Sequence, residues 1–466
     1  MIRLTWVQPE DLVGHELRQA AEDGRGTLPE VAAAARRWHA AGGHDAPPRA
    51  GASAGPAPEG LRALAGELLD ELAAIESPLP EPSSLEEIVA SCPDWPRGRA
   101  AVRPEPGRVL AAWWGRAAGC LLGKPVEKIP REGIRAIAEA TGNWPIRGWF
   151  TAKGLPPEIA ERWPWNRRSA ATSLAENIDG VPEDDDLNYA LLALTVLERH
   201  GPGFTTEDVA RAWLDALPAG RVFTAERAAY RNLLLGLEPP ATATHRNPFR
   251  EWIGALIRAD VYGWASPGDP ATAAARAWRD ARLSHTANGI YGAMFAAAMC
   301  AQALVAGSVD EVIEAGLSVV PPGSRLAVAV RQAVADAAAE PDFERVVDRL
   351  YARHGHLHWV HTVNNAALLA AALVHGAVHG AVHGAVPGAV HGAGDFAATV
   401  GSAVAGGWDT DSAAATAGSI AGALAGGVPA EWTTRDRLAS SLPGFDGVSI
   451  ESLAARTLAL IEGDRQ

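Results

Sequence analysis

From about residue 108 to the end of the chain, apolar residues recur at helical spacing in one alanine-rich segment after another. Proline and glycine supply the breaks, and stretches that alternate between apolar and polar residues in the manner of strands are scarce. Helices are clearest over 187–200 and 411–425, where each pattern ends at glycine and proline. The pattern predicts an all-α fold.

Small residues mark one face of the second of these helices. Gly418, Gly422 and Gly426 recur every four residues. Residues four apart share a helix face, so this face predicts a close approach to the backbone of a neighbouring helix.

The first 105 residues have a different character. The segment 42–60 is rich in glycine, proline and alanine and predicts a flexible linker. A helix is predicted over 61–75, followed by a run punctuated by proline. We therefore expect an N-terminal extension, residues 1–105, ahead of a helical domain that spans 106–466.

A low-complexity repeat interrupts the helical domain. The repeat HGAV places His375, His379, His383 and His391 at multiples of four residues, with Pro387 in place of a further histidine. Histidines four apart on a helix could hold a metal ion. Because glycine follows each histidine and Pro387 breaks the pattern, a loop over 375–394 is the favoured prediction.

Composition narrows the classes of function. The chain has 466 residues, is 48% hydrophobic and carries a formal net charge of −14, so no basic surface is expected for a nucleic acid or an anionic membrane. The apolar stretch 289–307 is nearly long enough to span a bilayer, but it is mostly alanine and lacks flanking basic residues, which favours a buried helix. With three cysteines and no signal-peptide pattern, a cytoplasmic location is predicted.

Two acidic segments carry the candidate chemistry, and each opens a predicted helix. The first is Glu183 to Asp186, and the second contains Asp409, Asp411 and Ser412 after a Gly-Gly pair. One or two acids stabilise a helix N-terminus, whereas four in a row repel one another unless a cation or solvent intervenes. Oxygen ligands without histidine or cysteine suit Mg²⁺, Mn²⁺ or Ca²⁺. Helix capping alone remains the alternative for either segment.

These motifs, in this order, resemble those of the ADP-ribosylglycohydrolases. The resemblance rests on GCLLGKPVE at 119–127, the acidic segment 183–186, Ser284-His285, and GWDTDS at 407–412. It covers the chain from about residue 108 onward and leaves the extension unmatched. The resemblance implies a helical bundle with two Mg²⁺ or Mn²⁺ ions in a central cleft and an ADP-ribose-type or riboside substrate, which includes ADP-ribosylated proteins.

The resemblance also implies roles for individual residues. The expected metal ligands are Glu183, Asp184, Asp185, Asp409, Asp411 and Ser412. The expected catalytic residues are Glu127, Asp185 and Asp409, and the expected substrate contacts are Gly123, Gly254, Ser284 and His285. The chemistry implied is hydrolysis of an N- or O-glycosidic bond, in which the ions orient ribose hydroxyls and a water and a carboxylate moves the proton.

Four positions depart from the family pattern. Glu183 and Asp186 stand where threonines are usual, Trp408 replaces a glycine, and Asp260 lies where the family is apolar. Two other functions therefore stay open: a non-catalytic member of the same fold, and a terpene-cyclase-like diphosphate enzyme that Asp184-Asp185-x-x-Asn188 loosely imitates.

Overall fold

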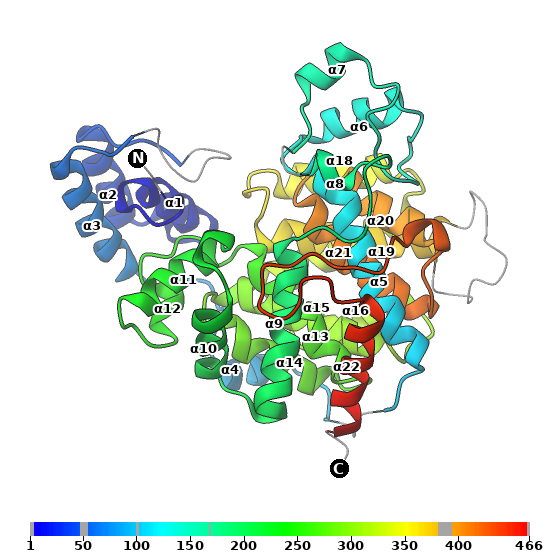
Figure 1. Ribbon diagram of the computed structural model, residues 1–466. Coiled ribbons are helices and arrows are strands. Elements are labelled where there is room, and N and C mark those ends of the chain that lie inside the picture. Colours follow the sequence, from blue (N-terminus) through cyan, green and yellow to red (C-terminus); the bar gives the residue numbers. More distant parts are fainter. Residues whose placement is uncertain (1–3, 47–54, 99–101, 167–168, 381–393, 464–466) are drawn as a thin grey trace.

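The computed structural model describes residues 4–46, 55–98, 102–166, 169–380 and 394–463. Throughout these ranges the regular structure is helical, and β pairing is limited to two isolated bridges, Val181 with Leu438 and Trp252 with His361. Figure 1 shows the helices gathered into one bundle with the α-helices of residues 9–73 at one side. The predicted all-α fold is confirmed.

The described part of the N-terminal extension contains four α-helices. They are α1 (Pro9–Glu22), α2 (Pro29–Ala40), α3 (Glu59–Ala73) and α4 (Leu85–Ser91), with a 3₁₀ turn η1 (Arg25–Thr27). Proline stands in the first turn of α1 and α2, where its missing N–H costs no hydrogen bond. The predicted helix over 61–75 is present as α3, which begins and ends two residues earlier than predicted. Residues 47–54 of the predicted linker lie outside the described ranges.

The remaining helices follow from Pro106. In the first half they are α5 (Pro106–Gly123), η2 (Lys124–Val126), α6 (Arg131–Ala140), α7 (Pro157–Arg162), α8 (Ala170–Ser173), α9 (Asp185–His200), η3 (Gly201–Gly203), α10 (Thr206–Ala216), η4 (Ala219–Arg221), α11 (Thr224–Leu234), α12 (Ala241–Thr244) and η5 (Ile253–Arg258). In the second half they are α13 (Asp260–Trp264), α14 (Pro270–Ala281), α15 (Ala287–Ala303), α16 (Val309–Ser318), α17 (Arg325–Ala339), α18 (Phe343–His354), α19 (Thr362–Val378), α20 (Phe396–Ala405), α21 (Thr410–Ala425), η7 (Ala430–Trp432) and α22 (Ile450–Gly463).

The closest helix pair is α5 with α21, which run antiparallel with their backbones in direct contact. A Cβ atom added to Gly115, Gly119 or Gly123 would lie 2.0, 1.9 or 2.3 Å from a carbonyl oxygen of α21. Gly418 and Gly422 of α21 face α5 in the same way. The predicted close approach is thus confirmed for these two glycines, whereas Gly426 has φ +71° and ends α21 as its left-handed cap.

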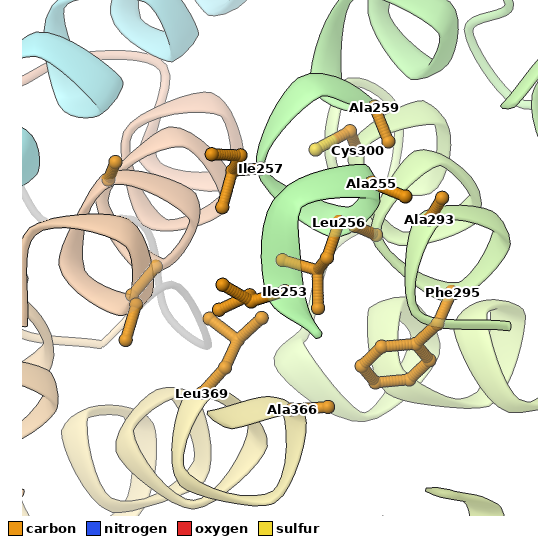
Figure 2. Packing of buried hydrophobic residues seen from close by; sticks show 14 of the residues in the cluster. Ile253, Ala255, Leu256, Ile257, Ala259, Ala293, Phe295, Cys300, Ala366 and Leu369 are labelled. Atoms are coloured by element: carbon orange, nitrogen blue, oxygen red, sulfur yellow. The ribbon is translucent and has the colours of Figure 1, made fainter. Parts of the chain in front are cut away.

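The 3₁₀ segment η5 lies within the hydrophobic core. Figure 2 shows Ile253 and Leu256 of η5 close to Leu369 and Ala366 of α19, with residues of α15 on the other side. The apolar stretch 289–307 forms most of α15, and its side chains are buried almost throughout. Among the described residues, no helix is both long and apolar enough to cross a membrane.

The helix α19 continues further into the HGAV repeat than predicted. It ends at Val378, so His375 lies within the helix and the predicted start of the loop is wrong. Nε2 of His375 lies 3.1 Å from the Pro341 carbonyl oxygen, and Nε2 of His379 lies 3.1 Å from the Ala337 carbonyl oxygen. These contacts near the end of α17 favour another turn of α19. His383, Pro387 and His391 fall outside the described ranges.

The α5–α21 contact leads to a stability prediction. Gly119→Ala should lower the free energy of unfolding by about 1–3 kcal/mol, because the new methyl group must push two backbones apart. The matched control is Gly107→Ala on the same helix, where an added Cβ would meet its neighbour at an ordinary 3.6 Å. Urea unfolding of both variants measures the difference, and equal midpoints would contradict the close contact.

Candidate active site

The candidate site lies where the C-terminus of α5 meets the N-termini of α9 and α21. The glycine contact brings Gly123 to the start of α21, and the hydroxyl of Thr410 donates a hydrogen bond of 2.9 Å to the Gly123 carbonyl. Both acidic segments begin helices here, so two positive helix ends face the same region. The three motifs that lie far apart in the sequence therefore share one site.

The second acidic segment reaches the site through a turn. Gly407 has φ +72°, and a Cβ there would lie 2.9 Å from the backbone of Arg131. Asp409 precedes the first helical residue with ψ 87°, so Asp409 and Asp411 need not point to opposite sides of a helix. The N–H of Asp409 donates to the Asn365 side-chain oxygen at 3.1 Å, which fixes the turn to α19.

Lys124 neutralises the first aspartate of the cluster. Its ammonium group is almost fully buried and contacts the Asp184 carboxylate and, at 2.5 Å, the Glu183 carbonyl oxygen. The other carboxylate oxygen of Asp184 accepts the Asp186 N–H at 3.0 Å and caps α9. Burial alone raises the pKa of Asp184, but the Lys124 ammonium outweighs it and holds this pKa below its ordinary value.

Arg116 is a second buried cation beside the cluster. Its guanidinium donates to the Asp260 carboxylate at 2.8 Å and lies 3.4 Å from the Asp186 carboxylate, and it also bonds the backbone oxygen of Asp186. The Ser412 hydroxyl donates to the remaining oxygen of Asp186 at 3.1 Å. Asp260, a departure from the family pattern, is therefore the partner of Arg116.

Four carboxyl groups at the centre share a raised pKa. Burial and then repulsion from Asp184 raise the pKa of Asp185 well above its ordinary value, and burial does the same for Asp186 against the opposing effect of Arg116. Burial followed by repulsion from Asp411 raises the pKa of Asp409. Burial followed by repulsion from Glu127 raises the pKa of Asp411 to about 8. The cluster holds more negative charge than its cations balance.

Glu127 lies at the edge of the cluster. Its carboxylate accepts a hydrogen bond of 2.7 Å from the Asn166 amide and forms an ion pair of 2.7 Å with the half-exposed Lys128. Because the charge of Glu127 acts on Asp185, Asp409 and Asp411, its carboxylate is near all three. Glu127 thus links the buried acids to the protein surface.

Glu183 is turned toward a different set of partners. One carboxylate oxygen accepts hydrogen bonds from the Asn188 amide at 3.1 Å and the Ser441 N–H at 3.0 Å. The other forms an ion pair of 2.9 Å with Arg221. These contacts occupy both oxygens of Glu183, whereas Asp186, which the resemblance left outside the ligand set, lies within the cluster.

Gly254, Ser284 and His285 gather in a second buried cluster. Arg258 at its centre donates to the Ser284 hydroxyl at 2.8 Å and to the Glu226 carboxylate at 2.6 Å. Ser284 is 2.8 Å from Nδ1 of His285, and both residues are at most 1% exposed. A Cβ on Gly254 would lie 2.1 Å from the Glu226 carboxylate. These three expected substrate contacts are therefore packed among protein groups, and the fourth, Gly123, is packed against the start of α21.

Two of the residues that complete the site were not expected from the motifs. The first is Arg116, which lies seven residues before Gly123, about two turns earlier on the same helix. This spacing is the signal in the sequence that could have indicated that Arg116 belongs to the site. The second is Cys120. Its sulfur and one carboxylate oxygen each of Asp184 and Asp186 lie within 4.8 Å of one another. Its thiol pKa is raised well above the ordinary value by burial and then by Asp184.

A known protein family matches this chain. The family model for ADP-ribosylglycohydrolase matches residues 102–466, which is most of the chain. The chain belongs to the ADP-ribosylglycohydrolase family. Members of this family are generally hydrolytic, typically depend on metal ions and act on ADP-ribose-type substrates. Membership leaves the terpene-cyclase alternative without support.

Two further comparisons complete the picture. A solved structure described as an ADP-ribosylglycohydrolase-related protein complex is similar at 21% identity and a TM-score of 0.44, and the match covers 78% of this chain and 99% of that chain. No curated protein matches this chain.

The raised carboxyl pKa values predict how stability depends on pH without metal. Asp411 titrates at about 8 when folded and at about 4 when unfolded, so the folded state binds more protons between these values. The free energy of unfolding should therefore fall as pH rises through this window. Urea unfolding with a chelator present measures the slope, which should be shallower for Asp411→Asn.

Asp70 provides the control for this titration. Its pKa is held below the ordinary value chiefly by a hydrogen bond from Arg246, so Asp70→Asn should leave the slope between about pH 5 and 8 unchanged. A wild-type slope of zero or of the opposite sign would contradict the proposed charge excess.

Proposed function

We propose that this protein is a metal-dependent hydrolase that cleaves an N- or O-glycosidic bond of ADP-ribose or a related riboside. The observation that carries the proposal is the buried meeting of two acidic helix N-termini with Glu127 at their edge, in a chain of this family. Burying carboxylates that no cation neutralises costs free energy. In a family of metal-dependent hydrolases, bound metal ions would neutralise them.

The charges of the site fit two divalent ions. Lys128, Lys124 and Arg116 pair with Glu127, Asp184 and Asp260. Within the described ranges, Asp185, Asp409 and Asp411 form no ion pair, and Asp186 shares Arg116. Four carboxylates in excess carry the charge that two divalent cations would neutralise, and their oxygens suit Mg²⁺ or Mn²⁺.

The carboxylates without an ion-pair partner define the proposed ligands. Asp185, Asp409 and Asp411 would hold the ions, while Asp184 and Asp186 stay tied to Lys124, Arg116 and Ser412. We leave Glu183 out of this set because both of its oxygens have other partners. When bound, such ions supply a polarised water and fixed positions for ribose hydroxyls.

Glu127 is the proposed proton acceptor. Asn166 and Lys128 fix its carboxylate, and its place at the edge of the cluster lets it meet a water that comes from the surface. A positioned carboxylate can accept a proton as the glycosidic bond is attacked. Asp185 and Asp409 would keep the reacting groups in place through the ions they hold.

The substrate is proposed to be recognised mainly through its ribose. Ser284, His285 and Gly254 are occupied by Arg258 and Glu226, so in this arrangement they offer little to an ADP-ribose moiety. This favours a small riboside over a bulky ADP-ribosylated protein. A cytoplasmic setting and the absence of a nucleic-acid partner remain predictions, supported by three free cysteines and the net charge of −14.

A ligand titration tests the proposal. Asp185→Asn and Asp409→Asn should each weaken Mn²⁺ binding by at least about tenfold and abolish release of ribose-containing product, because each removes an anionic ligand that no protein cation neutralises. Glu183→Gln is the matched control in the same acidic segment and should keep the wild-type Mn²⁺ affinity. Isothermal titration and a screen of ADP-ribosyl and ribosyl substrates provide the measurements. Wild-type affinity in both aspartate variants would refute the site.

A further inference from the structure

The extension is joined to the family region through buried charges. Glu16 of α1 accepts hydrogen bonds from Arg250 at 2.8 and 3.0 Å and from Arg25 at 2.8 Å. Arg25 also bonds the Asp23 carboxylate and the Leu72 carbonyl, so one guanidinium connects α1 with the end of α3. A buried charge network of this kind breaks at a high cost if one partner is removed. The extension is thus fixed to residue 250 and its neighbours.

The next residue, Glu251, receives contacts from both parts of the chain. Its carboxylate is 2% exposed and accepts from the Gln19 amide of α1 at 3.0 Å. Arg325 at the start of α17 donates to Glu251 at 2.7 Å, to Glu81 of the extension at 2.6 Å and to the backbone oxygen of Glu22 at 2.9 Å. The position of Glu251 therefore depends on side chains of the extension.

From Glu251 the contacts continue to the acidic site. The backbone oxygen of Glu251 accepts from Thr362 N–H at 3.0 Å, and Trp252 forms an isolated bridge with His361. One turn later, Asn365 donates to the His361 carbonyl at 2.8 Å and accepts the Asp409 N–H at 3.1 Å. All of these groups are buried, so the path of contacts runs through the interior of the protein.

A second set of contacts runs parallel to the first. His358 stacks on Trp252 at 4.0 Å, and Trp252 in turn contacts the ring of His15 of α1. The neighbouring Trp359 faces the Lys128 ammonium at 5.9 Å, and Lys128 is the ion-pair partner of Glu127. The segment 358–365 thus touches the extension's contacts on one side, and Asp409 and the Glu127 partner Lys128 on the other.

We infer that the N-terminal extension is a positioning element of the acidic site, acting through Glu251 and the segment 360–365 on Asp409. The effect of the extension on ion binding rests on the proposed function, in which Asp409 is a metal ligand. The placement of the Asp409 backbone does not depend on that function. Gln19 is the positioning residue of α1 whose removal leaves the charged partners paired with one another.

The inference is tested in the full chain with Gln19→Leu and Asn365→Ala. Hydrogen–deuterium exchange of the metal-free protein over 406–412 should become at least roughly threefold faster in each variant. Asn365→Ala removes the acceptor of the Asp409 amide, and Gln19→Leu loosens the segment that positions this acceptor. The Mn²⁺ affinity should fall roughly threefold to tenfold. In the double variant, Gln19→Leu should add nothing further, because its effect passes through Asn365.

The control is Leu68→Ala, which opens a cavity in the core of the extension away from this path. It should lower the unfolding midpoint yet leave exchange over 406–412 and Mn²⁺ affinity at wild-type values. If Gln19→Leu fails to fold, Arg325→Lys removes the fork that joins Glu81 to Glu251 and should give the same two changes. Unchanged exchange in Gln19→Leu, or additive effects in the double variant, would overturn the inference. Absent Mn²⁺ binding in the wild type would refute the proposed function alone.

Discussion

The backbone contact between α5 and α21 is the constraint on which the site depends. Glycines at 115, 119 and 123 remove every Cβ that would separate the two helices, so the end of α5 lies directly against the start of α21. Gly123 and Thr410 are then hydrogen-bonded across a separation of 287 residues. Lys124 comes directly after Gly123, and Asp409 and Asp411 flank Thr410, so the same hydrogen bond also places these groups. The N-terminal acids of α9 complete the cluster.

The acids of the site fall into two groups, those that are held by a protein cation and those between them that have raised pKa values. Lys124, Arg116 and Lys128 each hold one acid in place, and these ion pairs define the walls. The aspartates in between have raised pKa values because burial and mutual repulsion oppose their ionisation. Two helix N-termini reduce that cost without removing it. The protein therefore keeps a set of acids that are stable only as neutral groups or as ligands of cations.

The sequence was informative where function depends on local spacing. The all-α fold, the helices after Asp184 and Asp409, and the convergence of the acidic segments all follow from periodicity, turn glycines and resemblance. It was uninformative where partners come from distant segments. The direction of Glu183 is set by Arg221 and Ser441, and the burial of Ser284 and His285 by Arg258. The extension appeared to be a separate addition because no local pattern shows that Glu16 and Gln19 meet residues 250 and 251.

The long separation between α5 and α21 has a consequence for synthesis on the ribosome. The helix α5 emerges early, but the surface that covers its glycine face is translated nearly 300 residues later. During that interval the alanine-rich face of α5 and the acids of α9 lack their final neighbours, while the helices α1 to α3 can already pair with one another. Contacts this distant in sequence form late and slowly. The acidic centre is therefore among the last parts of the nascent chain to be assembled, and the interval before α21 arrives is when the chain is most open to aggregation and to chaperones.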